Sequence, residues 1–370
     1  MKASEINIEA LVTDGYEALD FSQYTAEDVQ NALAAETVQP EGFQALLSPA
    51  ARPFLEQMAQ KASRLTREHF GVNIQLYTPI YIANYCVNHC AYCGFNCTNR
   101  IQRAKLTPEE IEHEAQCIAQ TGLTDILLLT GESRRHSDVD YIAQGVRILD
   151  RYFSSIGIEV YPMHVEEYEQ VHAAGADYLS VYQETYDRAV YDEVHLSGPK
   201  KDYSYRFNAP ERGLMAGFRG VSIGALLGLS DFRKDAYCTG MHGWYLQRKY
   251  PHAEIGFSVP RLRPYANSGA YKSLVHDADL LQVMLAYRIF MPFAGVNIST
   301  RESRSFRDNV ITLAPTKMSA GVNTGVGGHD GERKGEAQFE ISDDRSVDEA
   351  RAFLASKGLQ VVFNDYVRTF

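Results

Sequence analysis

The sequence lacks the long apolar runs and the basic excess that membrane proteins and nucleic-acid binders use. No stretch of its 370 residues approaches the ~18 consecutive apolar residues of a membrane-spanning helix. Lys and Arg number 36 against 47 Asp and Glu, a formal net charge of −11, whereas non-specific affinity for nucleic acid comes mainly from Lys and Arg. The composition therefore disfavours nucleic acid and membrane surfaces as partners and favours a small-molecule substrate.

The N-terminal region lacks the apolar core of a signal peptide, because acidic residues such as Glu9 and Asp14 interrupt it. We therefore expect a cytoplasmic protein, in which thiols stay reduced and disulfides are rare. Six cysteines are present, and four of them fall within twelve residues. A dense group of thiols in a reducing compartment indicates metal binding rather than disulfide bonds. The four are Cys86, Cys90, Cys93 and Cys97.

Apolar periodicity predicts an α/β fold. Residues 1–72 have helical spacing, and from about residue 73 short apolar runs alternate with amphipathic stretches. Eight such β/α units predict a parallel, closed (β/α)8 barrel of the TIM type, with an open doubly wound sheet as the alternative. The predicted strands are 74–83, 125–129, 158–163, 178–182, 221–227, 254–259, 296–299 and 311–314.

The predicted organisation has three parts. Residues 1–72 form an N-terminal helical extension, residues 73–320 the barrel, and residues 321–370 a C-terminal loop and closing helix packed on the barrel. Within the third part, the glycine-rich stretch 321–335 is expected to be a mobile loop and 346–358 the closing helix.

Three of the clustered thiols have an informative spacing. Cys86-x3-Cys90-x2-Cys93 lies in one short loop after the first predicted strand, and thiolates suit iron–sulfur clusters or zinc. Structural zinc usually takes four ligands in two separated pairs, whereas three cysteines leave one iron of a cubane open to a substrate group. The spacing favours the open cluster. A zinc site and a cluster closed by Cys97 stay as alternatives.

The segment Cys86-Val87-Asn88-His89-Cys90-Ala91-Tyr92-Cys93 resembles the CxxxCxxC signature of the radical S-adenosylmethionine superfamily, including the aromatic residue before the third cysteine. Residues 81–86 and 93–100 narrow the resemblance to the aromatic-amino-acid lyases of that superfamily, in particular the 2-iminoacetate synthases, which are tyrosine lyases of thiamine biosynthesis. The similarity runs over most of the chain.

The resemblance implies a [4Fe–4S] cluster held by Cys86, Cys90 and Cys93, whose open iron binds S-adenosylmethionine. Reductive cleavage of that cofactor would yield a 5′-deoxyadenosyl radical, while the protein supplies position and exclusion of water. The implied reaction abstracts hydrogen from the amino group of L-tyrosine and cleaves Cα–Cβ. Its products are 2-iminoacetate for the thiazole of thiamine, 4-methylphenol, 5′-deoxyadenosine and methionine.

Candidate site residues follow the ends of predicted strands, where TIM barrels carry their active sites. For the substrate, the resemblance implies that Arg301 binds the amino-acid carboxylate, that Ser319 is a nearby polar contact, and that Tyr81 lies against the substrate or the adenosyl group. For S-adenosylmethionine, the candidates are Tyr92, Thr130, Gly131, Glu132, Glu159, Glu184 and Arg206.

The implied partners are L-tyrosine, a thiazole synthase that receives the unstable imine, and a flavodoxin or ferredoxin as reductant. Because 2-iminoacetate hydrolyses readily, closure of the site by residues 321–335 is a hypothesis for excluding water. Two alternatives stay open: a related lyase acting on another aromatic amino acid such as tryptophan, and an iron–sulfur electron carrier or zinc-stabilised binding protein. Hydrogenase-maturation tyrosine lyases are disfavoured, since they carry a C-terminal cysteine cluster and no cysteine follows Cys238.

Overall fold

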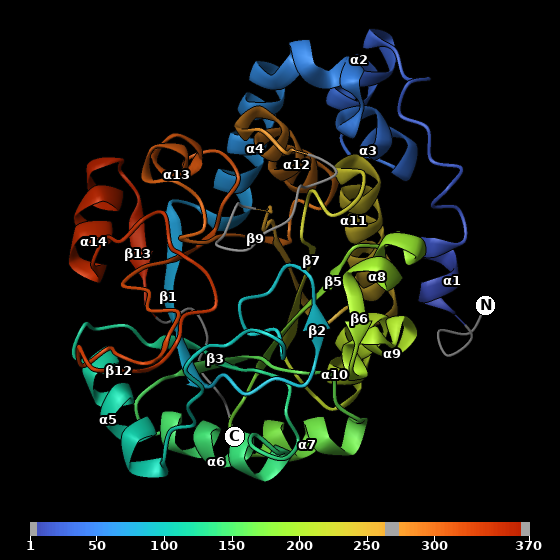
Figure 1. The fold of residues 1–370 in the computed structure, drawn as a ribbon. Coiled ribbons are helices and arrows are strands. Elements are labelled where there is room, and N and C mark those ends of the chain that lie inside the picture. The colour runs from blue at the N-terminus through green and yellow to red at the C-terminus, as the bar shows by residue number, and fades with distance from the viewer. Residues whose placement is uncertain (1–5, 263–273, 364–370) are drawn as a thin grey trace.

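The computed structural model describes residues 6–262 and 274–363, and eight strands in these ranges close into a parallel barrel (Figure 1). The last strand pairs with the first in parallel register, with Met318 opposite Leu76, which closes the sheet. The predicted (β/α)8 barrel is therefore confirmed, and the open doubly wound sheet is wrong. The barrel strands are β1 (Asn73–Ala83), β3 (Asp125–Thr130), β4 (Ser155–Glu159), β5 (Tyr178–Glu184), β7 (Gly220–Ala225), β8 (Glu254–Ser258), β9 (Gly295–Ile298) and β10 (Lys317–Ser319).

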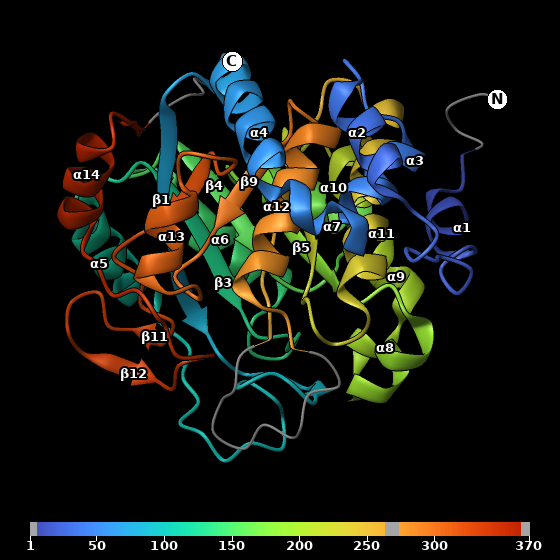
Figure 2. The ribbon, with the colours of Figure 1, turned by 90° about the horizontal axis from the view of Figure 1, so that it is seen from above.

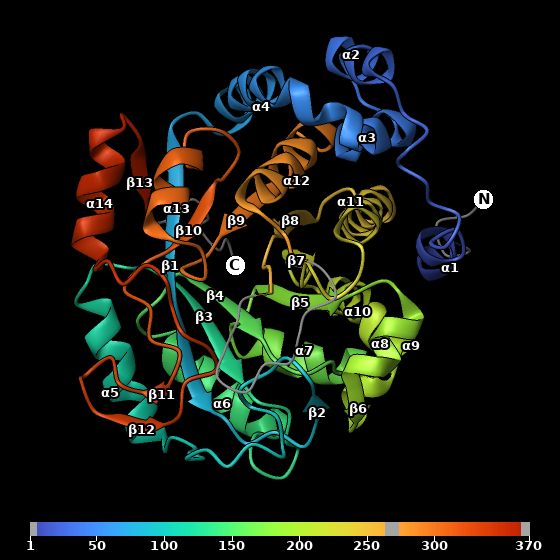
Figure 3. The ribbon, with the colours of Figure 1, turned by 45° about the horizontal axis from the view of Figure 1, so that its top comes forward.

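Helices surround the barrel on its outside (Figures 1 and 3). The strands are consequently buried on both faces, as parallel strands require; all six residues of β7 are buried. The crossover from β5 to β7 is the most elaborate, since it holds three α-helices, the 3-10 helix η3 (Pro199–Lys201) and a short strand. The crossover helices are α5 (Pro108–Ala119), α6 (Val139–Leu149), α7 (Val165–Ala173), α8 (Arg188–Val194), α9 (Tyr203–Phe207), α10 (Ala209–Met215), α11 (Phe232–Lys249), α12 (Asp277–Phe290) and α13 (Arg304–Val310).

The N-terminal helices lie outside the barrel against α11 and α12 (Figure 2). The last of them packs on α12, and the hydroxyl groups of Ser63 and Thr66 donate hydrogen bonds to the carbonyl groups of Thr312 and Leu313. The predicted helical extension is therefore present. Its elements are α1 (Ile8–Thr13), α2 (Ala26–Ala34), α3 (Pro40–Leu47), the 3-10 helix η2 (Pro49–Phe54) and α4 (Leu55–Phe70).

Two predicted strands are misplaced. The third begins at Ser155, three residues before the predicted start at 158, and ends at Glu159, four residues before the predicted end at 163. The prediction 311–314 is wrong, because these residues form a turn that follows α13, in which the amide of Leu313 donates to the carbonyl of Val310. The eighth strand is the three-residue β10, too short to show an alternating pattern.

The stretch 321–335 differs from the expected loop, since it contains a hairpin of β11 (Val326–Gly327) and β12 (Arg333–Gly335). Val326 pairs with Tyr81 of β1, and the amides of Gly328, His329 and Asp330 all donate to the buried carboxylate of Glu114. The closing helix is present as α14 (Val347–Ser356), followed by β13 (Gln360–Val362). The division of the chain at residues 72 and 320 stays a prediction.

None of the helices in the described ranges is both long and apolar enough to cross a membrane. Helix α5 begins with a capping box: the side chain of Thr107 accepts from the amide of Glu110, the Glu110 carboxylate accepts from the amide of Thr107, and Pro108 is the first helical residue.

Candidate active site

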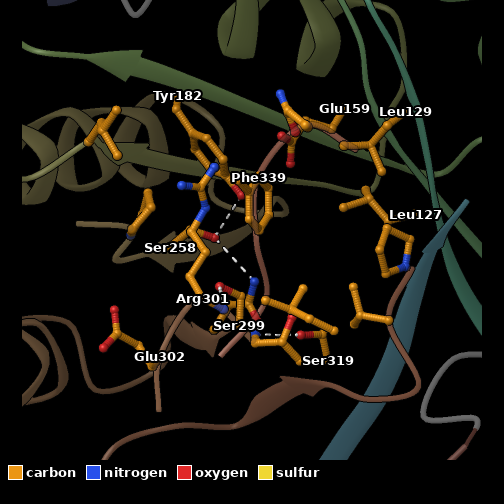
Figure 4. Close-up of a pocket in the computed structure, with 18 of the residues that line it drawn as sticks. Leu127, Leu129, Glu159, Tyr182, Ser258, Ser299, Arg301, Glu302, Ser319 and Phe339 are labelled. Carbon is orange, nitrogen blue, oxygen red and sulfur yellow. Dashed lines mark hydrogen bonds between the residues drawn. The ribbon is translucent and has the colours of Figure 1, made fainter. Parts of the chain in front are cut away.

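A cavity of about 250 Å³ opens at the carboxyl end of the barrel strands (Figure 4). Side chains from seven of the eight strand ends and from the segment after β12 line it, as expected for a TIM barrel. Seven predicted site residues meet there: Tyr81, Tyr92, Cys93, Glu159, Glu184, Arg301 and Ser319.

The loop after β1 carries the three cysteines and is held by contacts from distant parts of the chain. Its short strand β2 (His89–Cys90) pairs antiparallel with β6 (His195–Ser197) from the β5–β7 crossover. The guanidinium of Arg103 donates to the carbonyl groups of Asn84, Phe95 and Asn96 at 2.6, 2.9 and 2.7 Å. These bonds satisfy the turning backbone, so the loop has a defined shape although the two-residue β2 is its one strand.

The donor set of this loop fits an iron–sulfur cluster. Cys86, Cys90 and Cys93 are free thiols. Burial is the main cause that raises the pKa of Cys90 to about 12; the ammonium of Lys200 opposes the rise, and Cys93 and Cys86 add to it. Burial also raises the pKa of Cys86. A bound metal centre keeps coordinating thiols deprotonated, and soft thiolates suit iron.

Within the described ranges, no three His, Cys, Asp or Glu side chains converge on a single-ion site. A four-iron cluster is larger than one ion, and its ligands therefore need not point at one centre. Cys97 is exposed, and its amide donates to the carbonyl of Asn88 at 2.9 Å.

The Thr130–Glu132 segment after β3 packs directly against the cysteine loop. A Cβ atom at Gly131 would lie 2.3 Å from the carbonyl oxygen of Tyr85, so only glycine permits this approach. Glu132 accepts from the side chain of Asn88 at 2.6 Å, and its carbonyl accepts from the amide of Val87 at 2.8 Å. The Thr130 hydroxyl is buried and has no hydrogen-bond partner among the described residues. The segment thus supports the loop and leaves one polar group unused.

Glu184 lies at the end of β5 in a strained conformation, with a φ of 73°, the one positive value at a non-glycine residue in the described ranges. Lys200 donates to its carboxylate at 2.6 Å, and Arg206 approaches at 3.4 Å. Burial opposes ionisation, but Lys200 and Arg206 outweigh it and hold the pKa of Glu184 below its ordinary value. Strain of this kind is typical of functional sites.

Tyr92, the aromatic residue of the cysteine motif, donates its hydroxyl hydrogen to Nε2 of His195 at 2.7 Å. The other ring nitrogen of His195 lies 2.8 Å from the carbonyl of Tyr191, so Nδ1 carries the hydrogen and Nε2 accepts. Burial lowers the pKa of His195 to about 3, which keeps the ring neutral. The motif is therefore fixed through the same crossover that supplies Lys200.

At the other side of the cavity, Arg301 follows β9, and its guanidinium lies 3.6 Å from the ring centroid of Phe339. Figure 4 shows Arg301 reaching toward Tyr182 and Phe339, with Glu302 turned away. No carboxylate in residues 6–262 or 274–363 forms an ion pair with Arg301. Ser319 is buried, and its hydroxyl oxygen accepts from the amide of Thr300 at 3.1 Å.

Glu159 lies between the two sides, where the Ser180 hydroxyl is 3.4 Å from its carboxylate. Burial and the neighbouring Glu184 raise the pKa of Glu159, although Tyr182 and Arg301 oppose this. The pKa values of two glutamates at neighbouring strand ends are therefore shifted in opposite directions, Glu159 upward and Glu184 downward. The predicted role of Glu159 in cofactor binding stays a prediction, as do the roles of the other site residues.

Comparisons with known proteins agree with this geometry. A family model described as the Radical SAM superfamily matches residues 80–236, and one described as the Biotin and Thiamin Synthesis associated domain matches residues 258–360. The sequence is 40% identical over 343 residues to the 2-iminoacetate synthase of Escherichia coli (strain K12), covering 92% of this chain and 91% of that protein. The chain belongs to the 2-iminoacetate synthase family. As radical S-adenosylmethionine lyases, its members use a [4Fe–4S] cluster and S-adenosylmethionine.

Solved structures show the same fold. The FeFe-hydrogenase maturase HydG from Carboxydothermus hydrogenoformans superimposes with a TM-score of 0.88 at 30% identity, covering 98% of this chain and 85% of that one. Methylornithine synthase (PylB) gives a TM-score of 0.75 at 21% identity, over 90% of this chain and 97% of its own, and supports the fold alone. The barrel fold of this 2-iminoacetate synthase family member is thus also found in HydG and in methylornithine synthase.

Several site residues of this 2-iminoacetate synthase family member were missed from the sequence. Lys200 and His195 lie in the β5–β7 crossover, in a stretch without a motif, and Arg103 follows the cysteines at no recognisable spacing. Gln338 and Phe339 lie in a stretch without periodicity. One signal was present for Lys200: it is a cation in the crossover between the cofactor-binding candidates Glu184 and Arg206.

Proposed function

We propose that this protein cleaves the Cα–Cβ bond of L-tyrosine, giving 2-iminoacetate and 4-methylphenol for the thiazole of thiamine. The observation that carries the proposal is one cavity that contains both Cys93 of the cluster motif and the guanidinium of Arg301, which has no ion pair with any described carboxylate. An amino acid bound there through its carboxylate would have its amino group beside the cofactor. The name of the E. coli relative supports this product.

The cluster and S-adenosylmethionine supply, when bound, the radical that abstracts hydrogen. The residues of this chain orient the reactants. Arg301 is suited to bind a carboxylate with two parallel hydrogen bonds, and its stacking on Phe339 fixes the plane of the guanidinium. Holding the substrate nitrogen near the reacting carbon is where we expect most of the rate enhancement to arise.

Exclusion of water is the second task, because the imine product hydrolyses. Aromatic and aliphatic side chains such as Tyr81, Leu129 and Phe339 line the cavity, and the segment after β12 runs along its rim. The hairpin 321–335 and this segment are candidates for closure. The 2-iminoacetate formed by this protein would pass to a thiazole synthase, and a flavodoxin or ferredoxin would supply electrons.

The test is anaerobic reconstitution with iron and sulfide, followed by assays with S-adenosylmethionine, a reductant, and either L-tyrosine or L-tryptophan. We expect 4-methylphenol and 5′-deoxyadenosine in equal amounts with tyrosine only. Product from tryptophan instead would replace the proposed substrate. An electron carrier would form no 5′-deoxyadenosine in response to either amino acid.

A further inference from the structure

Residues 336–342, here called the strap, connect the cysteine loop to the substrate side of the cavity. At one end, the amide of Glu336 donates to the carbonyl of Gln102 at 3.0 Å, and the Asn84 side chain donates to the Glu336 carbonyl at 3.3 Å. At the other end, the amide of Ser342 donates to the carbonyl of Thr300 at 2.8 Å. Both ends of the strap are therefore fixed to the barrel mouth.

The middle of the strap touches the cysteine motif itself. A Cβ atom at Gly94, the residue after the third cysteine, would lie 2.3 Å from the carbonyl oxygen of Gln338. Only glycine allows this approach. The amide of Gln338 donates to the carbonyl of Thr324 at 3.1 Å, so its backbone is held from both sides.

The side chain of Gln338 bridges the substrate wall and a cluster ligand. Its Oε1 accepts from the hydroxyl of Tyr81 at 2.8 Å, and its Nε2 lies 3.8 Å from Sγ of Cys93. A thiolate bound to iron can only accept hydrogen bonds, and the amide nitrogen can only donate. The orientation with nitrogen toward sulfur is therefore the one that satisfies all three groups.

We propose that Gln338 is a positioning residue that raises the reduction potential of the cluster through an N–H···S bond to Cys93, reinforced by Tyr81. Reduction adds negative charge to the cluster and its sulfurs, and a hydrogen-bond donor stabilises that charge. The Tyr81 hydroxyl polarises the amide and makes its N–H a stronger donor. The inference rests on the cluster ligated by Cys93 and not on the identity of the amino-acid substrate.

The experiment compares wild type, Gln338→Leu and Gln102→Leu by potentiometric titration of the reconstituted cluster, followed by electron paramagnetic resonance. Gln102 is an exposed glutamine that meets the strap through its backbone carbonyl, so it is a matched control. We expect Gln338→Leu to lower the reduced-to-oxidised ratio at a fixed potential at least threefold, about 30 mV at ~59 mV per tenfold for one electron. Gln102→Leu should titrate as wild type.

A second readout separates this role from a loosened loop. Electron–nuclear double resonance in D2O should show one exchangeable proton fewer near the cluster in Gln338→Leu. If Gln338→Leu only loosened the strap and admitted water, the reduction potential of the cluster would rise, because water stabilises the reduced cluster. The direction of the shift therefore separates the two explanations. An unchanged or raised potential in Gln338→Leu with four irons bound would overturn the proposal.

Tyr81→Phe keeps the test open if Gln338→Leu fails to hold four irons. This variant leaves the amide in place and removes only the phenol that polarises it. We expect a smaller shift in the same direction, with the exchangeable proton retained. A potential equal to that of wild type in Tyr81→Phe would, in that case, overturn the proposal.

Discussion

The two sides of the barrel cavity differ in how their charges are balanced. Beside the cysteine loop, Glu184 is paired with Lys200 and Arg206, so both signs of charge are present together. On the opposite side, Arg301 has no carboxylate partner within residues 6–262 and 274–363. A site with both signs suits the amino and carboxylate groups of S-adenosylmethionine, whereas a lone cation suits a single carboxylate.

The largest expected effect is loss of the iron–sulfur cluster, and with it of all activity. Cys90→Ala removes one of the three predicted cluster ligands, so we expect both 4-methylphenol and 5′-deoxyadenosine to fall to background and iron content to drop. Iron analysis and product assays after anaerobic reconstitution check this. Cys97→Ala is the control, since its side chain is exposed and outside the motif. Loss of the cluster in Cys97→Ala would instead make Cys97 a ligand.

The second effect is on stability. Glu184→Gln leaves the buried Arg206 and the half-buried Lys200 without their carboxylate, and breaking a buried pair costs about 3–5 kcal/mol. The pKa of Glu184 is lowered, so its contribution is present above pH ~4.5 and is lost as the pH falls through the folded-state value. Thermal unfolding should therefore separate variant from wild type at pH 7 and bring them together in acid.

Exposed Glu169 on α7 supplies the control for this measurement. Glu169→Gln should change stability by less than about 0.5 kcal/mol at either pH, as is usual for surface substitutions. If Glu184→Gln were as stable as Glu169→Gln at pH 7, the charge balance described for the cofactor side would be incorrect.

The third effect is on substrate binding. Arg301→Met removes a cation that has no carboxylate partner among residues 6–262 and 274–363, and losing such a contact to a substrate carboxylate costs about 2–5 kcal/mol. We expect KM for tyrosine to rise on the order of 100-fold, with S-adenosylmethionine binding little changed. Steady-state kinetics and equilibrium binding of the cofactor check this. Arg304→Met, at an exposed arginine three residues on, should leave both unchanged.

The smallest effect sharpens the contrast between the two glutamates. Burial raises the pKa of Glu159, so wild type loses stability as the pH rises above ~4.5 and the carboxyl group ionises inside the protein. Glu159→Gln cannot ionise and should gain up to about 1 kcal/mol relative to wild type between pH 5 and pH 8. Melting temperatures across that range check the sign, which is opposite to that for Glu184.

The sequence predicted what depends on local pattern. The cysteine motif spans eight residues, and seven barrel strands are long enough to show apolar runs, so both could be recognised. The three-residue β10 offers no such run, and the apolar turn 311–314 took its place. The strands also placed Arg301 and Ser319 at one end of the barrel.

Contacts between distant segments could not be predicted. Lys200 meets Glu184 because the β5–β7 crossover folds back over the cysteine loop, and nothing in residues 195–201 indicates that path. Gln338 lies 245 positions from Cys93, in a stretch without regular structure. Both contacts arise from tertiary packing, which no local periodicity encodes.

The pairing of β2 with β6 and the contact of the strap with Gly94 bear on biogenesis. Residues that shape the cysteine loop are translated about 100 and about 240 positions after it. While the cysteine motif emerges from the ribosome, neither β6 nor the strap has been synthesised, so the loop lacks both segments that it packs against. We therefore expect metal loading to follow completion and release of the polypeptide, so that assembly factors meet a finished barrel rather than a nascent loop.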